Sequence, residues 1–179
     1  MTTAARDDSF AALAVAEAIA ALELVKAEAL PDLVKALPDF MSDPGYLLGW
    51  RKLGTQLTDY EKRQLGMSAR AFMSKELLVH LTPLGMRDPT NAHAVTLQRA
   101  SHSLSRAVSL QGLLDSAMQM EARRICPETA GCDDPQDWTD PAALDPLPPA
   151  HCRDCLYRTC RSVFVFRRKG RRTTIVANG

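Results

Sequence analysis

The sequence lacks long apolar runs and is poor in aromatic residues. No stretch reaches the roughly 18 apolar residues that a membrane-spanning helix needs. Phe, Trp and Tyr make up 6% of the 179 residues, so the core has to consist mainly of Ala, Leu, Val and Met. A core of this kind favours helices over a β-sandwich. The N-terminal segment carries acids where a secretory signal peptide carries bases, and we therefore expect a cytoplasmic protein.

Motifs of the common enzyme classes are also missing. The chain contains no Gly-rich phosphate loop, no nucleophile elbow and no His-Glu-x-x-His zinc motif. His80, His93 and His102 are spread along the chain without the spacing of a metal pair on one helix face. We therefore expect a protein that is not an enzyme.

Charge is distributed very unevenly along the chain. Residues 151–179 carry eight Arg or Lys and a single acid, Asp154, whereas the net charge of the whole chain is only +1. The segment 127–150 has six acids, no base and six of the 11 prolines. A basic end of this kind indicates binding to phosphate or to an acidic partner. The alternative is that the acidic segment neutralises the basic end within one molecule.

Apolar spacing predicts a helical domain over residues 1–125. Positions three and four residues apart are repeatedly apolar, and Ser, Thr, Pro and Gly punctuate the pattern. Pro38 is expected to end the second helix. The predicted helices cover 10–29, 31–37, 46–53 and 90–124.

A helix-turn-helix pattern occurs at residues 58–81. Thr58 followed by Glu61 forms a capping box. Gly66 can end this helix, and Ser68 can cap a second one that runs to Leu81. The string LTDYEKRQLGMSARAF resembles the generic bacterial helix-turn-helix, in which the second helix enters the major groove. The alternative is a plain helical hairpin. The resemblance implies DNA contacts from Ser68, Arg70, Ser74 and Lys75.

The C-terminal third is expected to be mostly irregular before it ends in strands. The Pro- and Asp-rich segment should be loop, with Trp138 anchoring it to the helical body. Residues 163–176 alternate or are β-branched on either side of Lys169-Gly170, which predicts a β-hairpin.

All five cysteines follow residue 125, with spacing C-x5-C, then 19 residues, then C-x2-C-x4-C. A C-x2-C pair lets two thiolates converge on one ion, and tetrahedral zinc needs four ligands. A Pro-rich segment with one hairpin cannot build a core, so a structural metal would supply folding energy. Cys152 and Cys155 are the firmest candidates. The other ligands are expected among Cys126, Cys132 and Cys160, with His151 as a further candidate.

An iron–sulfur cluster is the alternative cofactor, because a C-x2-C followed closely by a third cysteine is also a cluster arrangement. The pattern resembles that of WhiB-like regulators, which pair one distant cysteine with C-x2-C-x5-C and a basic tail. The string CRDCLYRTC also resembles the cysteine motif of RecB-type nucleases, with an aromatic between cysteines. The last gap here is one residue shorter than in both families. Cysteines without any metal are the third interpretation.

These patterns together predict a mainly α protein with a helical domain at 1–125 and a Cys-rich zinc-binding module at 126–179. The order of helices, late cysteines and basic end is similar to that of the zinc-binding subunit of the bacterial flagellar master activator. We expect a transcriptional regulator that binds DNA. A protein-interaction subunit with structural zinc and an iron–sulfur redox sensor are the alternatives. The tail residues expected to contact phosphates are Arg167, Arg168, Lys169, Arg171 and Arg172.

Overall fold

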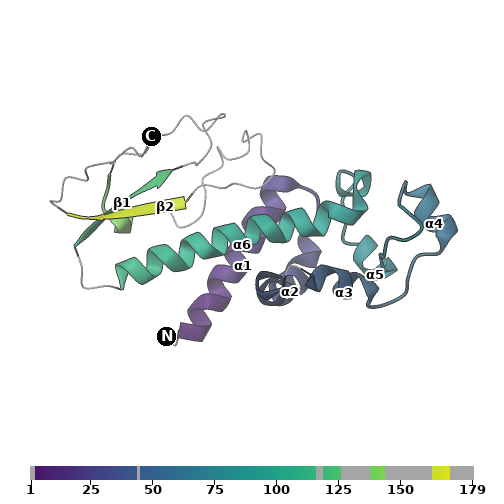
Figure 1. The fold of residues 1–179 in the computed structure, drawn as a ribbon, viewed down its shortest axis with the longest axis horizontal. Helices are drawn as coiled ribbons and strands as arrows, with labels where there is room; N and C mark the ends of the chain where they lie inside the picture. The colour runs from purple at the N-terminus through teal and green to yellow at the C-terminus, as the bar shows by residue number, and fades with distance from the viewer. Residues whose placement is uncertain (1–2, 44, 116–118, 126–137, 144–162, 170–179) are drawn as a thin grey trace, which may run out of the picture. The chain divides into compact units, whose positions relative to one another are not determined.

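The computed structural model describes residues 3–43, 45–115, 119–125, 138–143 and 163–169. The expected mainly helical fold is confirmed, and a two-stranded antiparallel sheet accompanies the helices (Figure 1). The chain divides into two compact units, 1–104 and 105–179, and the division falls inside the longest helix. The elements are α1 (Thr3–Leu22), η1 (Ala27–Ala29), α2 (Leu30–Ser42), α3 (Tyr46–Lys52), α4 (Asp59–Gln64), α5 (Lys75–Leu78), η2 (Gly85–Arg87), α6 (Pro89–Leu114), β1 (Met120–Ile125), η3 (Pro141–Ala143) and β2 (Val163–Arg168).

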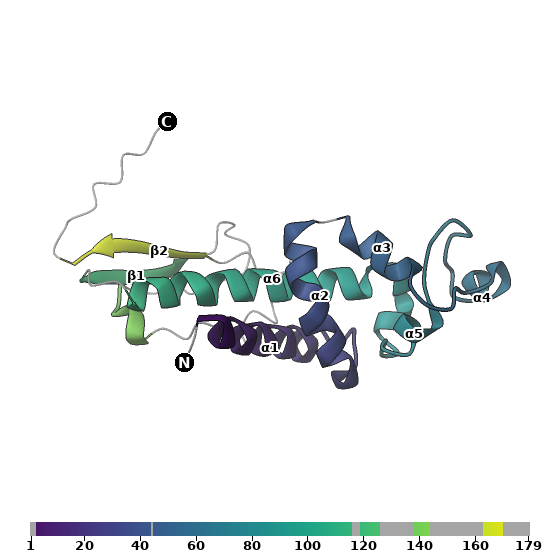
Figure 2. The same ribbon diagram turned by 90° about the horizontal axis from the view of Figure 1, so that it is seen from below.

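The core of the N-terminal unit lies between α1, α2 and the first part of α6. Figure 2 shows α1 running beside α6. Small residues such as Ala18 and Ala100 are fully buried and let the helices approach closely. The larger buried residues fill the space between them. They include Val15, Leu33, Leu37 and Leu97.

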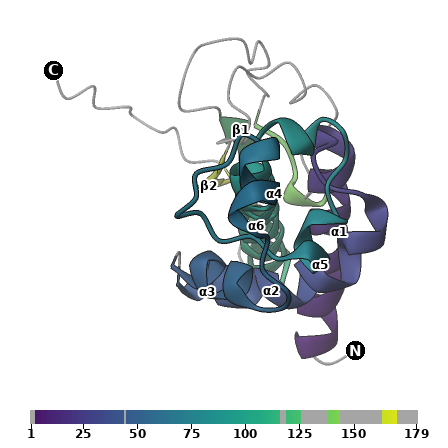
Figure 3. The same cartoon turned by 90° about the vertical axis from the view of Figure 1, so that its right-hand side faces the viewer.

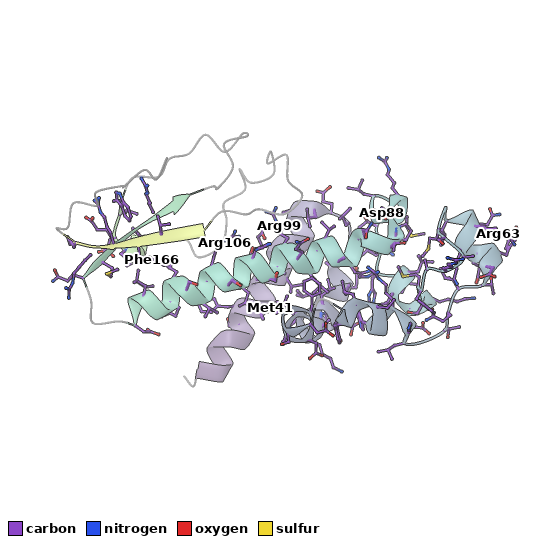
Figure 4. All side chains as sticks on the ribbon, viewed as in Figure 1. Met41, Arg63, Asp88, Arg99, Arg106 and Phe166 are labelled. Atoms are coloured by element: carbon purple, nitrogen blue, oxygen red, sulfur yellow. The ribbon has the colours of Figure 1, made fainter. Side chains whose placement is uncertain are left out.

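A buried ion pair joins α1 to α6. The Arg99 Nε donates a hydrogen bond of 3.0 Å to the Glu17 carboxylate, and the Ser103 hydroxyl donates to the same carboxylate at 3.3 Å. Arg99 is labelled on α6 in Figure 4 and is 2% exposed. Because an unpaired buried charge is costly, loss of this contact between α1 and α6 would destabilise the N-terminal unit.

The loop after α1 pairs with the loop before α6. Lys26 N–H donates to the His80 carbonyl at 2.7 Å, and Thr82 N–H donates to the Leu24 carbonyl at 3.1 Å. Gly85 lies against this junction: a Cβ at that position would be 2.0 Å from the Leu24 carbonyl oxygen. The junction therefore requires glycine there.

Two helix boundaries differ from the prediction. The first helix ends at Leu22 rather than near residue 29, because Glu23 adopts a positive φ of 53°. Pro38 does not end the second helix but lies inside α2, which continues to Ser42. The buried Leu33 and Leu37 anchor α2 to the core, and their packing outweighs the roughly 3 kcal/mol that an interior proline costs.

The helix predicted over 68–81 is wrong, although the helix before it is confirmed. α4 has the expected capping box, and Gly66 has a φ of +66°. Ser68 instead begins a turn, and α5 has only four residues, capped by Ser74. The cause is an extended pairing: Leu57 N–H donates to the Met73 carbonyl at 3.0 Å. Figure 3 looks onto this end of the N-terminal unit.

The helix predicted over 90–124 is too long. α6 ends at Leu114, and the residues of β1 form a strand instead. The strand expected at 163–168 is confirmed as β2, but its described partner is β1 in antiparallel register. The expected partner segment, 173–176, lies outside the described residues. The alternation of MEARRI places Ala122 on the buried face, which suits a strand better than a helix face.

Candidate nucleic-acid interface

The two strands and the residue that follows them form a surface that we call the basic ribbon (β1, β2 and Lys169). In the register, Glu121 faces Arg167 and Arg123 faces Val165. Side chains alternate between the two faces of a sheet, so these four residues share one face. The ribbon carries a single acid, Glu121, and five cationic residues: Arg123, Arg124, Arg167, Arg168 and Lys169.

Trp138 provides the aromatic part of this surface. Thr139, next to it, pairs with Ala122 on the edge of β1 that β2 leaves free, through two hydrogen bonds of 2.9 Å. The indole ring stacks with two guanidinium groups. Its centroid is 4.3 Å from the guanidinium carbon of Arg167 and 4.8 Å from that of Arg123. Such cation–π contacts hold long cationic side chains in a defined position.

The two arginines on Trp138 differ in how far their charge is neutralised. Arg167 Nε donates a hydrogen bond of 2.7 Å to the Glu121 carboxylate, and this pair is partly exposed. The Nε of Arg123 is buried and has no hydrogen-bond partner among the residues that the structure describes. Arg123 therefore offers the stronger attraction for an added anion.

Further along the ribbon, Arg168 and Lys169 are exposed. A pocket of about 320 Å³ lies at this end of β2. Asp140 and Lys169 give it one charge of each sign, and its remaining lining residues are Leu113, Leu114, Gln119, Met120 and Pro141. Arg171 and Arg172, the other predicted tail contacts, lie outside the described residues.

The other predicted DNA contacts lie in the N-terminal unit. Ser68 and Arg70 are exposed in the turn after α4, and Lys75 is the first residue of α5. The Lys75 ammonium lies 2.8 Å from the Glu61 carboxylate and is the main cause that lowers the pKa of Glu61 to about 2. Figure 4 labels Arg63 on α4, beside this region. Residues 68–81 form no recognition helix, so this segment has no element that could enter a DNA groove in the predicted way. The DNA contacts of Ser68, Arg70 and Lys75 stay a prediction.

The predicted metal ligands belong to the C-terminal third of the chain. Cys126, Cys132, Cys152, Cys155 and Cys160, together with His151, lie outside the described residues. Within the ranges that are described, no three His, Cys, Asp or Glu side chains come together as a metal site. Zinc and the alternative iron–sulfur cluster both stay predictions.

Two histidines of the N-terminal unit, His80 and His93, lie close together, although their spacing in the sequence did not indicate this. The His80 and His93 rings lie 6.0 Å apart, and His93 stacks edge-on against Trp50 at 5.4 Å. His93 is fully buried, and neither ring nitrogen has a hydrogen-bond partner in the described part of the chain. Burial, with smaller contributions from the charges of His80 and Arg51, lowers the pKa of His93 to about 3. The neutral ring therefore acts as a core side chain.

Sequence reasoning missed Arg123 and Glu121 as part of the interface, because it assigned both to the end of a helix. The available signal was the alternation of apolar and charged residues over the first four positions of MEARRI, together with the β-branched and aromatic residues of VFVFRR. Comparison of the chain with protein families, curated proteins and solved structures gives no match. No helix in the described ranges is both long and apolar enough to cross a membrane.

Proposed function

We propose that this protein binds nucleic acid through the basic ribbon. The observation that carries the proposal is the collection of five cations and one acid on two paired strands and the residue after them. Phosphate contacts from Lys and Arg supply most of the sequence-independent affinity for nucleic acids. Transcriptional regulation is the role that we propose for this binding.

A structural zinc ion would stabilise the ribbon from one end. Ile125 and Val163 are register partners at the same end of the sheet. Cys126 follows Ile125 directly, and Cys160 precedes Val163 by three residues. The two cysteine-bearing segments therefore leave the sheet from paired positions. An isolated two-stranded sheet is only marginally stable, so a metal that ties these segments together would hold the ribbon in shape.

A protein-interaction subunit is the second candidate function. Large apolar side chains are exposed on the N-terminal unit: Leu48 is 51% exposed, and Leu53, Tyr60 and Val79 are between 64% and 66% exposed. Exposed apolar residues can mark a protein interface when they are contiguous. This function would place binding on the helices rather than on the ribbon.

The test compares two double variants that remove the same charge. Arg168→Ala with Lys169→Ala alters the exposed end of the ribbon, and Arg70→Ala with Lys75→Ala alters the turn and α5. We expect the wild type to shift a random-sequence oligonucleotide in a gel and to be retained by heparin. The ribbon variant should weaken both, while the second variant should change them little. Equal loss of binding in both variants would mean that the overall positive charge, and not the ribbon in particular, determines binding, and would contradict the proposal. Loss in the second variant alone, or no binding by the wild type, contradicts the proposal.

A further inference from the structure

We propose that the preferred ligand of the basic ribbon is a single-stranded polynucleotide, with one base stacked on Trp138 and a neighbouring phosphate held by Arg123. This inference rests on the proposed function and names the substrate class of the same site. The juxtaposition that carries it is an indole in contact with two guanidinium groups on a sheet face.

The position of Trp138 on the sheet suits a stacking platform. Thr139 pairs with one edge of β1, whereas Arg167 belongs to β2 at the opposite edge. Because the indole reaches Arg167 at 4.3 Å, the ring extends across the face of β1. The indole remains partly exposed there. Sheet faces with aromatic side chains are a recurrent way to bind unpaired bases.

The contacts between the Trp138 ring and the two guanidinium groups are weak enough for a base to displace one of them. Stacking of a base on an aromatic side chain is worth more than an exposed cation–π contact. A base can therefore replace one guanidinium on the ring. When a base displaces Arg167 from the indole ring, Arg167 keeps the Glu121 carboxylate as its partner. The Arg167 Nε lies 2.7 Å from this carboxylate in the structure. Arg123 has no such partner among the described residues, so its guanidinium is the one we assign to phosphate.

Single strands are favoured over duplexes by the same geometry. In a duplex the faces of the bases are covered by their neighbours, and an indole can reach them only after a base is unstacked, which costs energy. Single strands present base faces and phosphates together, and sequence-tolerant binding of this type combines aromatic stacking with a cationic track. Lys169, whose N–H donates to the Gln119 carbonyl, extends the register by one pair and continues the cationic track on the face of Arg167. Arg168 lies on the opposite face, as the alternation along β2 requires.

The experiment uses the full chain and the fluorescence of Trp138. The protein has two tryptophans, so Trp50→Phe leaves Trp138 as the only reporter. Circular dichroism of this variant verifies that the helices are retained. The probes are oligo(dT), oligo(rU), a duplex of the same length and inorganic polyphosphate. The two single strands distinguish DNA from RNA as the source of the ligand.

We expect either single strand to quench the Trp138 fluorescence and to bind at least tenfold more tightly than the duplex. Polyphosphate should bind without comparable quenching. Trp138→Leu should lower oligonucleotide affinity about tenfold without changing the charge, and Trp138→Phe should restore most of it. Binding of the duplex as tightly as the single strands, or binding without quenching, overturns the inference but leaves the proposed function intact. Failure of every polyanion to bind overturns both.

Discussion

Glu121 and Arg167 lie directly opposite each other on paired strands, and the Arg167 Nε donates a 2.7 Å hydrogen bond to the Glu121 carboxylate. Glu121 is the single acid of the basic ribbon, so this pair reduces the positive charge that the ribbon presents. Partly exposed pairs of this kind contribute little to stability, about 0–1 kcal/mol. Their effect on the charge of the surface is the larger consequence.

Replacing Glu121→Gln should therefore tighten nucleic-acid binding. The substitution frees Arg167 for phosphate and should make the slope of log K against log salt steeper by roughly 0.7–0.9, the value for one added phosphate contact. Fluorescence anisotropy with a labelled oligonucleotide at several salt concentrations measures both. Glu28→Gln is the matched control, because it removes an exposed acid from the N-terminal unit, which contains no residue of the ribbon. An equal gain in the control would assign the effect to net charge alone.

The buried His93 makes the N-terminal unit sensitive to acid. Burial lowers the pKa of His93 in the folded protein to about 3, below its ordinary value of 6.5. The unfolded chain therefore binds the proton more readily. The stability that the neutral ring confers is fully present above pH 6.5 and is lost progressively as the pH falls toward 3, by up to about 1.4 kcal/mol per pH unit.

Denaturant unfolding followed by circular dichroism between pH 7 and 5 separates the histidines from most carboxylates, which titrate at lower pH. Comparison of variants then isolates His93 among the four histidines of the chain. We expect His93→Leu to abolish most of the pH dependence in this window. His102→Gln, on the same helix, should retain it. Identical pH profiles for the wild type and His93→Leu would show that His93 does not couple folding to protonation.

Two glycines should respond in opposite ways to the same substitution. At Gly85 an added Cβ would be 2.0 Å from the Leu24 carbonyl oxygen, so Gly85→Ala should destabilise the N-terminal unit by about 1–3 kcal/mol. Gly49 lies within α3, and a Cβ added there would meet no atom within 4 Å, so Gly49→Ala should stabilise by about 0.5–1 kcal/mol. Thermal melts compare the two. If Gly85→Ala left the melting temperature unchanged, the two loops would have to move apart at no cost in stability, which would contradict this prediction.

The late cysteines are expected to bind about one zinc ion per chain. Elemental analysis of protein purified without added metal should detect zinc at that ratio. Cys152→Ser with Cys155→Ser should remove it and weaken oligonucleotide binding, because the ribbon would lose its support. Iron and sulfide in equal amounts, with a brown colour, would favour the iron–sulfur alternative. Metal-free protein that binds nucleic acid normally would exclude a structural role for either.

The sequence predicted the parts of the fold that depend on local chemistry. The capping box of Thr58 and Glu61 and the left-handed Gly66 need only neighbouring residues, and both are confirmed. The stripe of Leu97 and Ala100 was also sufficient to locate the core face of α6.

The predictions that failed depended on contacts between distant segments. The turn at Ser68 and the short α5 result from pairing of Leu57 with Met73, which no local signal reveals. β1 is a strand because it pairs with β2, about 40 residues later in the chain. For the interface, Arg167 and Lys169 were named from charge alone, whereas Trp138 was expected only as an anchor.

The most direct test of the account is the salt dependence of oligonucleotide binding by the wild type and by a variant in which Arg167, Arg168, Lys169, Arg171 and Arg172 are all alanine. Arg167 is engaged by Glu121, so four of these residues are expected to contact phosphates in the wild type. At 0.7–0.9 per contact, the slope of log K against log salt should then fall in magnitude by roughly three units, and affinity at low salt should collapse. An unchanged slope and affinity would contradict the assignment of nucleic-acid binding to the basic ribbon and its tail.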